Sequence, residues 1–256
     1  MTATAMGARS RAGSLGLGAI GILLTGLAWE VIGQTEAFGR TFPPFSAIIE
    51  TLVDPDRRDL FGRALGATVD SAVKGFVLGV LIGVGTAALG VVIPALREGL
   101  DRLAAVVHAI PLIALGPFLI VTLSREGTPT AIATLAVVFN VFVAASAGLR
   151  AASDQHHDVL SVLGAGRRSR FRHLQLPAAL PAIADGLKLA APAAVLGAIL
   201  GEWFGAPRGV GIVIVSALQN YQIELLWSAA VLGAGLSLIA FAAFGALELW
   251  VAGRFR

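Results

Sequence analysis

Residues 75–96 read GFVLGVLIGVGTAALGVVIPAL, a run of 22 residues without Asp, Glu, Lys or Arg. An α-helix needs about 20 apolar residues to cross the hydrocarbon core of a bilayer. Only helices and closed barrels satisfy their backbone groups in lipid, and this run lacks the alternation of a barrel strand. The stretch therefore predicts a membrane-spanning helix.

Five further stretches have a similar length and composition, and they lie at residues 12–29, 103–124, 127–149, 178–201 and 225–247. The stretch 178–201 is interrupted by Asp185 and Lys188, which lie three residues apart on one helical face and are expected to pair. The chain is predicted to be an all-α integral membrane protein with six transmembrane helices.

The composition supports this fold class and excludes several functions. Hydrophobic residues make up 56% of the chain and charged residues 14%, whereas soluble domains have about 25% charged residues. The absence of cysteine rules out disulfides, thiolate metal ligands and cysteine nucleophiles. A net charge of +3 is too small to indicate nucleic-acid binding. The lipid bilayer is the expected surrounding.

Basic residues predict the orientation. The most basic connection is 150–182, which carries Arg150, Arg167, Arg168, Arg170 and Arg172, and the positive-inside rule favours placing it and both chain ends in the cytoplasm. The expected division is a cytoplasmic tail at 1–13, an uncleaved first transmembrane helix at 14–33, an extracytoplasmic segment with a short amphipathic helix at 34–74, a transmembrane core at 75–252 that includes the 150–182 loop, and a cytoplasmic tail at 253–256.

The loop between the fourth and fifth spans carries the most informative pattern. Val159, Val162 and Leu163 give its first helix an apolar stripe, which needs a protein partner because no lipid surrounds it. Gly164 and Gly166 break this helix before a basic segment. The alternative interpretation is a basic loop that only fixes membrane topology.

The spacing in this loop resembles the coupling loop, or EAA loop, of ATP-binding-cassette (ABC) importer permeases. Asp158 stands at the acidic position, Val159-Leu160 replaces the usual Ala-Ala, and Gly164 and Leu176-Pro177 follow at the family spacing. Other stretches are similar to the permeases of nitrate, taurine, aliphatic-sulfonate and bicarbonate importers; they include Pro43-Pro44-Phe45-Ser46 and the run GEWFGAPRGVG at 201–211.

The resemblance implies a type I ABC importer permease fold in a bacterial inner membrane. It implies a dimeric pore made with a second copy of the permease, two ABC ATPase subunits and an extracytoplasmic substrate-binding protein. The residues that would couple to the ATPase are Asp158, Val159, Leu160, Leu163, Gly164, Ala165, Arg167, Arg168 and Pro177. Anionic lipid headgroups explain the arginines equally well.

The same resemblance implies that the chain is not an enzyme and binds no cofactor, since ATP and Mg²⁺ would be bound by the ATPase. Neither Lys74 nor Lys188 completes a phosphate-binding Gly-Lys-Ser/Thr loop, and no catalytic residue or metal ligand set is indicated. The expected cargo is a small anion such as nitrate, a sulfonate or taurine. A thiamine-precursor-like heterocycle or an aromatic acid is the alternative, and a gradient-driven secondary transporter is the alternative class.

Four residues in or beside the spans are candidates for the translocation path or a gate: His108, Asn140, Glu202 and Trp203. Each has a simpler interpretation. His108 could satisfy backbone groups freed by Pro111, Asn140 could bond to a neighbouring helix, and Glu202 with Trp203 could anchor the chain at the membrane interface. Glycines at positions 75, 79 and 83 share one helical face and indicate close helix packing.

Overall fold

The computed structural model describes residues 3–152 and 154–255, and within them it contains helices and no strand. The helices are α1 (Ala3–Gln34), α2 (Phe45–Val53), α3 (Arg58–Val92), α4 (Arg97–Ala109), α5 (Gly116–Leu149), α6 (Asp154–Val162), α7 (Arg167–Arg170), α8 (Leu176–Glu202), α9 (Val210–Gln219) and α10 (Ile223–Phe255). Short 3₁₀ turns lie at Gly39–Thr41, Pro55–Arg57, Pro94–Leu96 and Leu112–Leu115, and a π-helical turn lies at Phe171–Gln175. The predicted all-α fold class is confirmed.

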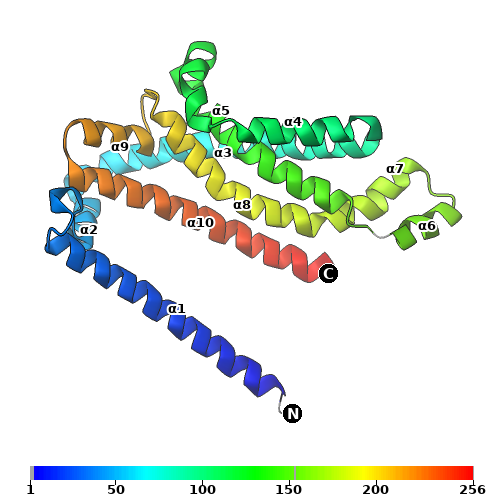
Figure 1. Ribbon diagram of the computed structural model, residues 1–256, viewed down its shortest axis with the longest axis horizontal. Helices are drawn as coiled ribbons and strands as arrows, with labels where there is room; N and C mark the ends of the chain where they lie inside the picture. The colour runs from blue at the N-terminus through cyan, green and yellow to red at the C-terminus, as the bar shows by residue number, and fades with distance from the viewer. Residues whose placement is uncertain (1–2, 153, 256) are drawn as a thin grey trace.

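Four long helices, α3, α5, α8 and α10, run lengthwise beside one another (Figure 1). The short helices α2 and α9 lie at one end of this bundle, which we call the α9 end. At the opposite end, the α6 end, lie α6 and α7. The helix α1 lies apart from the bundle and meets it only at its end, near α2 (Figure 1).

Glycines hold α3 against α5. A Cβ added at Gly79 would lie 2.6 Å from the Val137 Cβ, and one at Gly83 would lie 2.9 Å from the Val138 carbonyl oxygen. A Cβ at Gly75 would overlap the Ala133 side chain. The close helix packing predicted for this glycine row is confirmed, because the backbones approach too closely for any larger residue.

An adjacent face of α5 packs on α8 through a second set of small residues. A Cβ at Gly197 would lie 2.8 Å from the Ala133 Cα, and one at Gly148 would lie 2.9 Å from the Ala179 carbonyl oxygen. The helix α5 is therefore clamped between α3 and α8. This three-helix core contains much of the buried apolar surface, including Val137, which is fully buried.

Five of the described helical stretches are long and apolar enough to cross a membrane, and they lie at Leu17–Gln34, Pro55–Val92, Leu112–Leu149, Arg168–Glu202 and Ile223–Arg254. Six spans are therefore not confirmed, and the expectation of one continuous helix is wrong in one place. The predicted span 103–124 is not one helix, because α4 ends at Ala109 and the next turn begins at Leu112. Pro111 is the physical reason: it has no N–H and it disfavours helical geometry at Ile110, whose ψ is 123°.

The interrupted stretch nevertheless runs the length of the bundle. Just before this stretch, Asp101 forms an ion pair of 3.7 Å with Arg150 at the α6 end of α5. Farther along, Gly116 lies against the ring of Phe204, which follows α8 at the α9 end. The chain then reverses at Ser124, where φ is 70°, before the long remainder of α5.

A second sequence-based expectation, the local pair between Asp185 and Lys188, is also wrong. The Lys188 ammonium lies 3.4 Å from a carboxylate oxygen of Glu248 and 5.0 Å from the centre of the Phe241 ring. Both partners belong to α10. The pairing across two helices is preferred because the face of α8 that carries Lys188 packs on α10.

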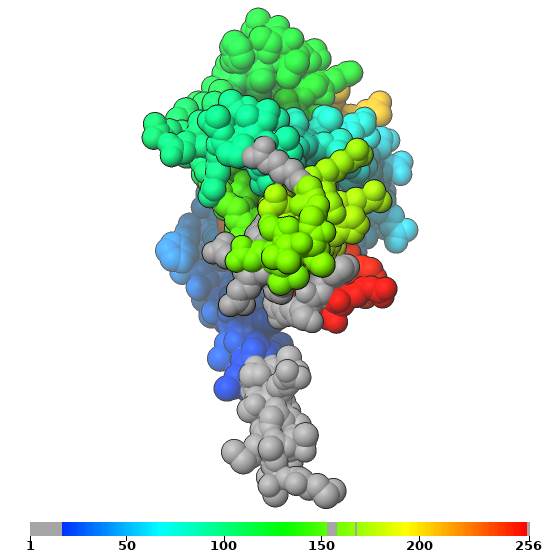
Figure 2. All heavy atoms as spheres, turned by 90° about the vertical axis from the view of Figure 1, so that its right-hand side faces the viewer, coloured from blue at the N-terminus to red at the C-terminus, as the bar shows by residue number. Residues whose placement is uncertain are grey.

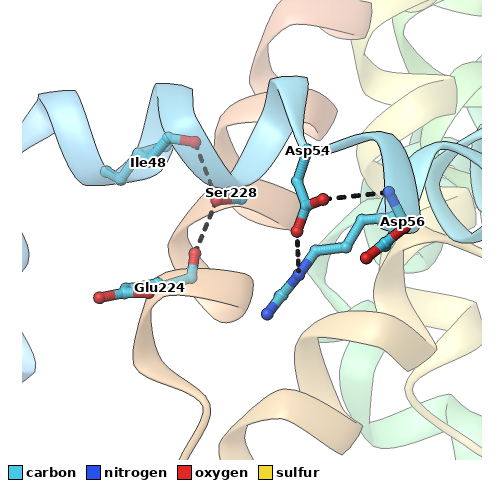
Figure 3. A network of polar contacts seen from close by, with 6 residues as sticks. Ile48, Asp54, Asp56, Glu224 and Ser228 are labelled. Carbon is cyan, nitrogen blue, oxygen red and sulfur yellow. Dashed lines mark hydrogen bonds and ion pairs between the residues drawn. The ribbon is translucent and has the colours of Figure 1, made fainter.

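The α9 end is closed by aromatic and polar contacts. The indole N–H of Trp227 donates to the Thr41 carbonyl at 2.9 Å, and the Trp227 ring packs edge-on against Phe42. The Ser228 hydroxyl donates to the carbonyl of Ile48 in α2 and to that of Glu224 in its own helix (Figure 3). These contacts fix α2, a short helix within the segment 34–74 where one was predicted, on the beginning of α10.

Candidate functional site

The helix α6 occupies the surface at its end of the molecule, where the atoms of residues 158–166 face the viewer in Figure 2. Asp158 is exposed, and so are Val159 and Val162, the latter to 88%. Leu163, one residue beyond the helix, is 74% exposed. Three large apolar side chains of the predicted stripe therefore lie on the surface, where burial against a partner would be favourable.

Gly164 ends this helix in a specific way. Its N–H donates to the Ser161 carbonyl at 3.0 Å, and the Ala165 N–H donates back to the Leu160 carbonyl at 2.9 Å. These two bonds, with a φ of +73° at Gly164, form a Schellman motif. The left-handed backbone explains why glycine stands at this position, and both Leu160 and Ala165 are half-buried beneath the turn.

The basic segment then returns the chain to the bundle. The Arg170 guanidinium donates to the Ser161 hydroxyl at 3.1 Å, which ties α7 to α6. Arg168 is exposed, and the side chain of Arg167 lies outside the described residues. Pro177 is in the first turn of α8, where a missing N–H is tolerated.

Two of the candidate path residues share a cavity. A hollow of about 540 Å³ lies between the break after α4, the middle of α5 and the C-terminal half of α8. His108 and Asn140 both line it, among mostly apolar side chains. The His108 ring stacks on Phe139 with centroids 3.8 Å apart, and the Asn140 amide donates to the Ala136 carbonyl of its own helix at 3.2 Å.

The other two candidates lie elsewhere, at the junction of α8 and α9. Glu202 is only 1% exposed. One carboxylate oxygen accepts from the Thr68 hydroxyl at 2.8 Å and the other accepts from the Gly211 N–H at 2.7 Å. The Thr68 hydroxyl in turn accepts from the Val210 N–H at 2.9 Å. This network provides hydrogen-bond acceptors for the first two N–H groups of α9 and joins that helix to α3 and α8.

Two glycines permit this arrangement. A Cβ at Gly209, whose φ is +139°, would overlap the Glu202 carboxylate, and one at Gly211 would lie 3.0 Å from the Trp203 ring. Trp203 itself is partly exposed just beyond α8. The geometry gives Glu202 the role of a helix cap, and a role in the translocation path stays a prediction.

The sequence patterns did not single out Thr68. It is fully buried and bonds to both Glu202 and α9, but threonine in an apolar helix usually bonds to its own backbone. Nothing in the sequence distinguishes it from such a threonine. Among the described side chains, no group of three or more His, Asp or Glu lies close enough to hold a metal ion.

The chain is similar to known membrane proteins over most of its length. A family model described as "Binding-protein-dependent transport system inner membrane component" matches residues 65–253. A probable ABC transporter permease protein of Haemophilus influenzae is 27% identical over 221 residues, which are 86% of this chain and 89% of that protein.

Two further relatives are named after the solute that they transport. The formylaminopyrimidine transport permease protein ThiX of Halalkalibacterium halodurans is 26% identical over 88% of this chain and 90% of its own length. The taurine transport system permease protein TauC of Escherichia coli is 26% identical over 92% of this chain and 85% of its own. The relatives carry different solutes, so the similarity indicates a type of machinery more firmly than a cargo.

Proposed function

The chain belongs to the family of binding-protein-dependent transport system inner membrane components, and we propose that it forms the translocation pore of an ATP-driven importer for a small solute. In this proposal a separate ABC ATPase binds ATP and Mg²⁺ and hydrolyses the nucleotide. Two copies of this chain enclose the path, and a binding protein delivers the solute from outside the inner membrane.

One observation supports the coupling role most directly, namely the exposed apolar stripe of α6. Val159, Val162 and Leu163 lie beyond the bundle in the connection between α5 and α8, next to an acidic side chain at Asp158. Burial of a valine or leucine side chain contributes about 1.5–3 kcal/mol. A helix with this stripe is suited to lie in a groove of a partner protein.

The Schellman turn makes this helix a defined unit. Because Gly164 ends α6 abruptly, its stripe is presented as a short rigid helix rather than as a flexible loop. Closure of the two ATPases on ATP would move the attached helices as rigid bodies, and the bundle would alternate between inward and outward access.

The path itself is proposed to follow the cavity that contains His108 and Asn140. The cavity lies beside the broken stretch after α4, and irregular backbone at membrane depth is tolerated where it lines a cavity. We therefore assign the stretch 97–123 to a sixth, discontinuous crossing, which places both chain ends in the cytoplasm together with α6.

The contact with the ATPase is tested by reversing a charge and by breaking the stripe. Asp158→Arg and Val162→Glu should each remove ATPase from the chain purified in mild detergent from its native host, and should abolish ATP-driven uptake. Val53→Glu is the matched control, because Val53 is an exposed valine on a short helix at the α9 end.

Membrane insertion and the amount of protein should be unchanged in all three variants. Crosslinking in the membrane from position 162 should capture the same ATPase. It also detects complexes that dissociate in detergent. If neither experiment finds an ATPase and uptake depends on an ion gradient, the chain is a secondary transporter and the importer proposal is wrong.

A further inference from the structure

Asp185 is an exposed carboxylate inside a membrane-spanning helix. It lies nine residues after the beginning of α8, or about 14 Å along the helix axis, and within the apolar stretch 178–201. Among the described residues it has no hydrogen bond and no ion pair, as the neighbouring basic group is engaged elsewhere. Lys188 is bound to Glu248 and faces the Phe241 ring on α10.

The face of α8 that carries Asp185 is continuous with the cavity. Leu189 and Leu196 lie four and eleven residues farther along the helix on the same side, and they are 59% and 57% exposed. Leu196 also lines the cavity with His108 and Asn140. The charged position and the cavity thus belong to one face of α8.

The adjacent, buried side of α8 packs on α5. A Cβ at Gly186 would lie 3.5 Å from the Asn140 carbonyl oxygen and would overlap the Ala144 side chain. The turn of α8 that carries Asp185 is therefore packed on the turn of α5 that carries Asn140. Polar groups from two helices lie at neighbouring levels of the bundle.

The free-energy cost of an unpaired carboxylate inside the membrane limits what this face of α8 can contact. Facing acyl chains, a charged side chain costs at least about 2.5–3.5 kcal/mol, and such residues almost always face the protein interior or a water-filled cavity. No cation on the described residues compensates for Asp185. Acyl chains do not solvate a carboxylate, and Asp185 has no protein partner among the described residues. Water is then the contact that solvates it.

We propose that the face of α8 formed by Asp185, Leu189 and Leu196 lines the aqueous solute path, and that Asp185 makes this path select solutes that are positively charged or rich in N–H donors. The proposal rests on the importer function and narrows its cargo. An aminopyrimidine or similar nitrogen heterocycle fits this lining. Nitrate and sulfonates are disfavoured, since one carboxylate from each of two copies repels a small oxyanion.

The absence of native cysteine allows a direct test. The assembled transporter is prepared with Leu189→Cys, with Asp185 either intact or changed to Asn. Each form is treated with two membrane-impermeant methanethiosulfonates of similar size, one carrying a trimethylammonium group and the other a sulfonate. Leu238→Cys is the control, because Leu238 is an exposed leucine (68%, against 59% for Leu189) on a different helix, α10.

With Asp185 intact, the cationic reagent should react with the thiol of the Leu189→Cys variant at least about tenfold faster than the anionic reagent, after normalisation to their rates with a free thiol. A charge about 6 Å away attracts one reagent and repels the other, even in water-like surroundings. With Asp185→Asn the normalised ratio should fall to about one. The Leu238→Cys variant should react with neither reagent.

Other outcomes would overturn the proposal. An unreactive thiol at position 189 places the face against lipid or protein, and a ratio near one with Asp185 intact removes the charge selection. The same preparations separate failure of this proposal from failure of the importer function. If the chain is not an importer permease, no ATPase co-purifies even with the unsubstituted chain. Retention of ATPase in both forms of the Leu189→Cys variant confirms that they are assembled.

Discussion

Gly164 and Gly166 lie two residues apart in one loop, yet only Gly164 has a left-handed backbone. An added methyl group would meet no atom within 4 Å at either position, so packing does not distinguish them. Gly164→Ala should cost about 1 kcal/mol by strain alone and should weaken ATPase binding and uptake. Gly166→Ala should leave both unchanged, and Gly164→Asn should be milder than alanine because asparagine tolerates this geometry.

The measurement is the amount of ATPase recovered per permease, together with the uptake rate, for the three variants. Equal effects at 164 and 166 would mean that the Schellman turn does not determine how α6 is presented. The substitutions Gly164→Ala and Gly166→Ala each add one methyl group that meets no other atom. They differ in the backbone conformation of the substituted residue.

Glu202 is predicted to contribute to stability through Thr68. Thr68→Val and Glu202→Ala should each lower the unfolding free energy by about 1–3 kcal/mol, because each leaves buried polar groups without partners. The double variant should lose less than the sum of the two single losses. Thr86→Val is the control, since the Thr86 hydroxyl bonds only to the Ile82 carbonyl of its own exposed helix face.

Melting of the detergent-purified chain reports these differences. Should Glu202→Gln abolish uptake while melting stays at the value of the original chain, the gate role predicted from sequence would replace the helix cap. Additive losses in the double variant would instead show that the two side chains act independently.

At this scale the sequence predicted which residues carry polar chemistry but not which of them meet. His108 and Asn140 were chosen separately, and both line one cavity beside the break at Pro111. Lys188 was assigned a partner three residues away, whereas its partner is 60 residues away on α10. Pairing across helices depends on helix rotation, which a local pattern does not contain.

Among the elements, the contact between α3 and α5 offers the clearest test of packing. Gly79→Ala should destabilise the chain by about 1–3 kcal/mol, because the new Cβ would lie 2.6 Å from the Val137 Cβ and 2.9 Å from the Thr134 carbonyl oxygen. Gly85→Ala, on the same helix, meets no atom within 4 Å and should be neutral or slightly stabilising. The melting temperature in one detergent compares the two. A loss of equal size at Gly85 would assign the effect to α3 itself instead of to its contact with α5.

The elements were mostly predictable because a long apolar run permits few structures in a membrane. The glycine row at 75, 79 and 83 also predicted close packing, since a four-residue repeat places small residues on one helical face. The stretch 103–124 shows the limit of this reasoning. Its composition satisfies the hydropathy requirement, but Pro111 divides it, and the backbone constraint prevails over the apolar pattern.

For the whole molecule, the membrane topology depends on whether the interrupted stretch 97–123 crosses the membrane. From the segment after α1 to α6 there are three crossings if residues 97–123 span the membrane and two if they do not. The bundle favours three, because Asp101 lies at the α6 end and Gly116 lies at the α9 end. An odd number of crossings places Phe38 and Val162 on opposite sides of the membrane.

Single cysteines on the native cysteine-free background test this arrangement. Phe38→Cys and Tyr221→Cys should be labelled by an impermeant maleimide from outside the inner membrane, whereas Val162→Cys should be labelled only after lysis; all three side chains are largely exposed. Tyr221 serves as the internal standard, because the single crossing of α8 separates it from α6 whatever the third stretch does. Labelling of Phe38→Cys together with Val162→Cys, opposite to Tyr221→Cys, would reduce the crossings to five. The beginning of α1 would then lie outside, and the broken stretch that lines the cavity would fold back without reaching the cytoplasmic side.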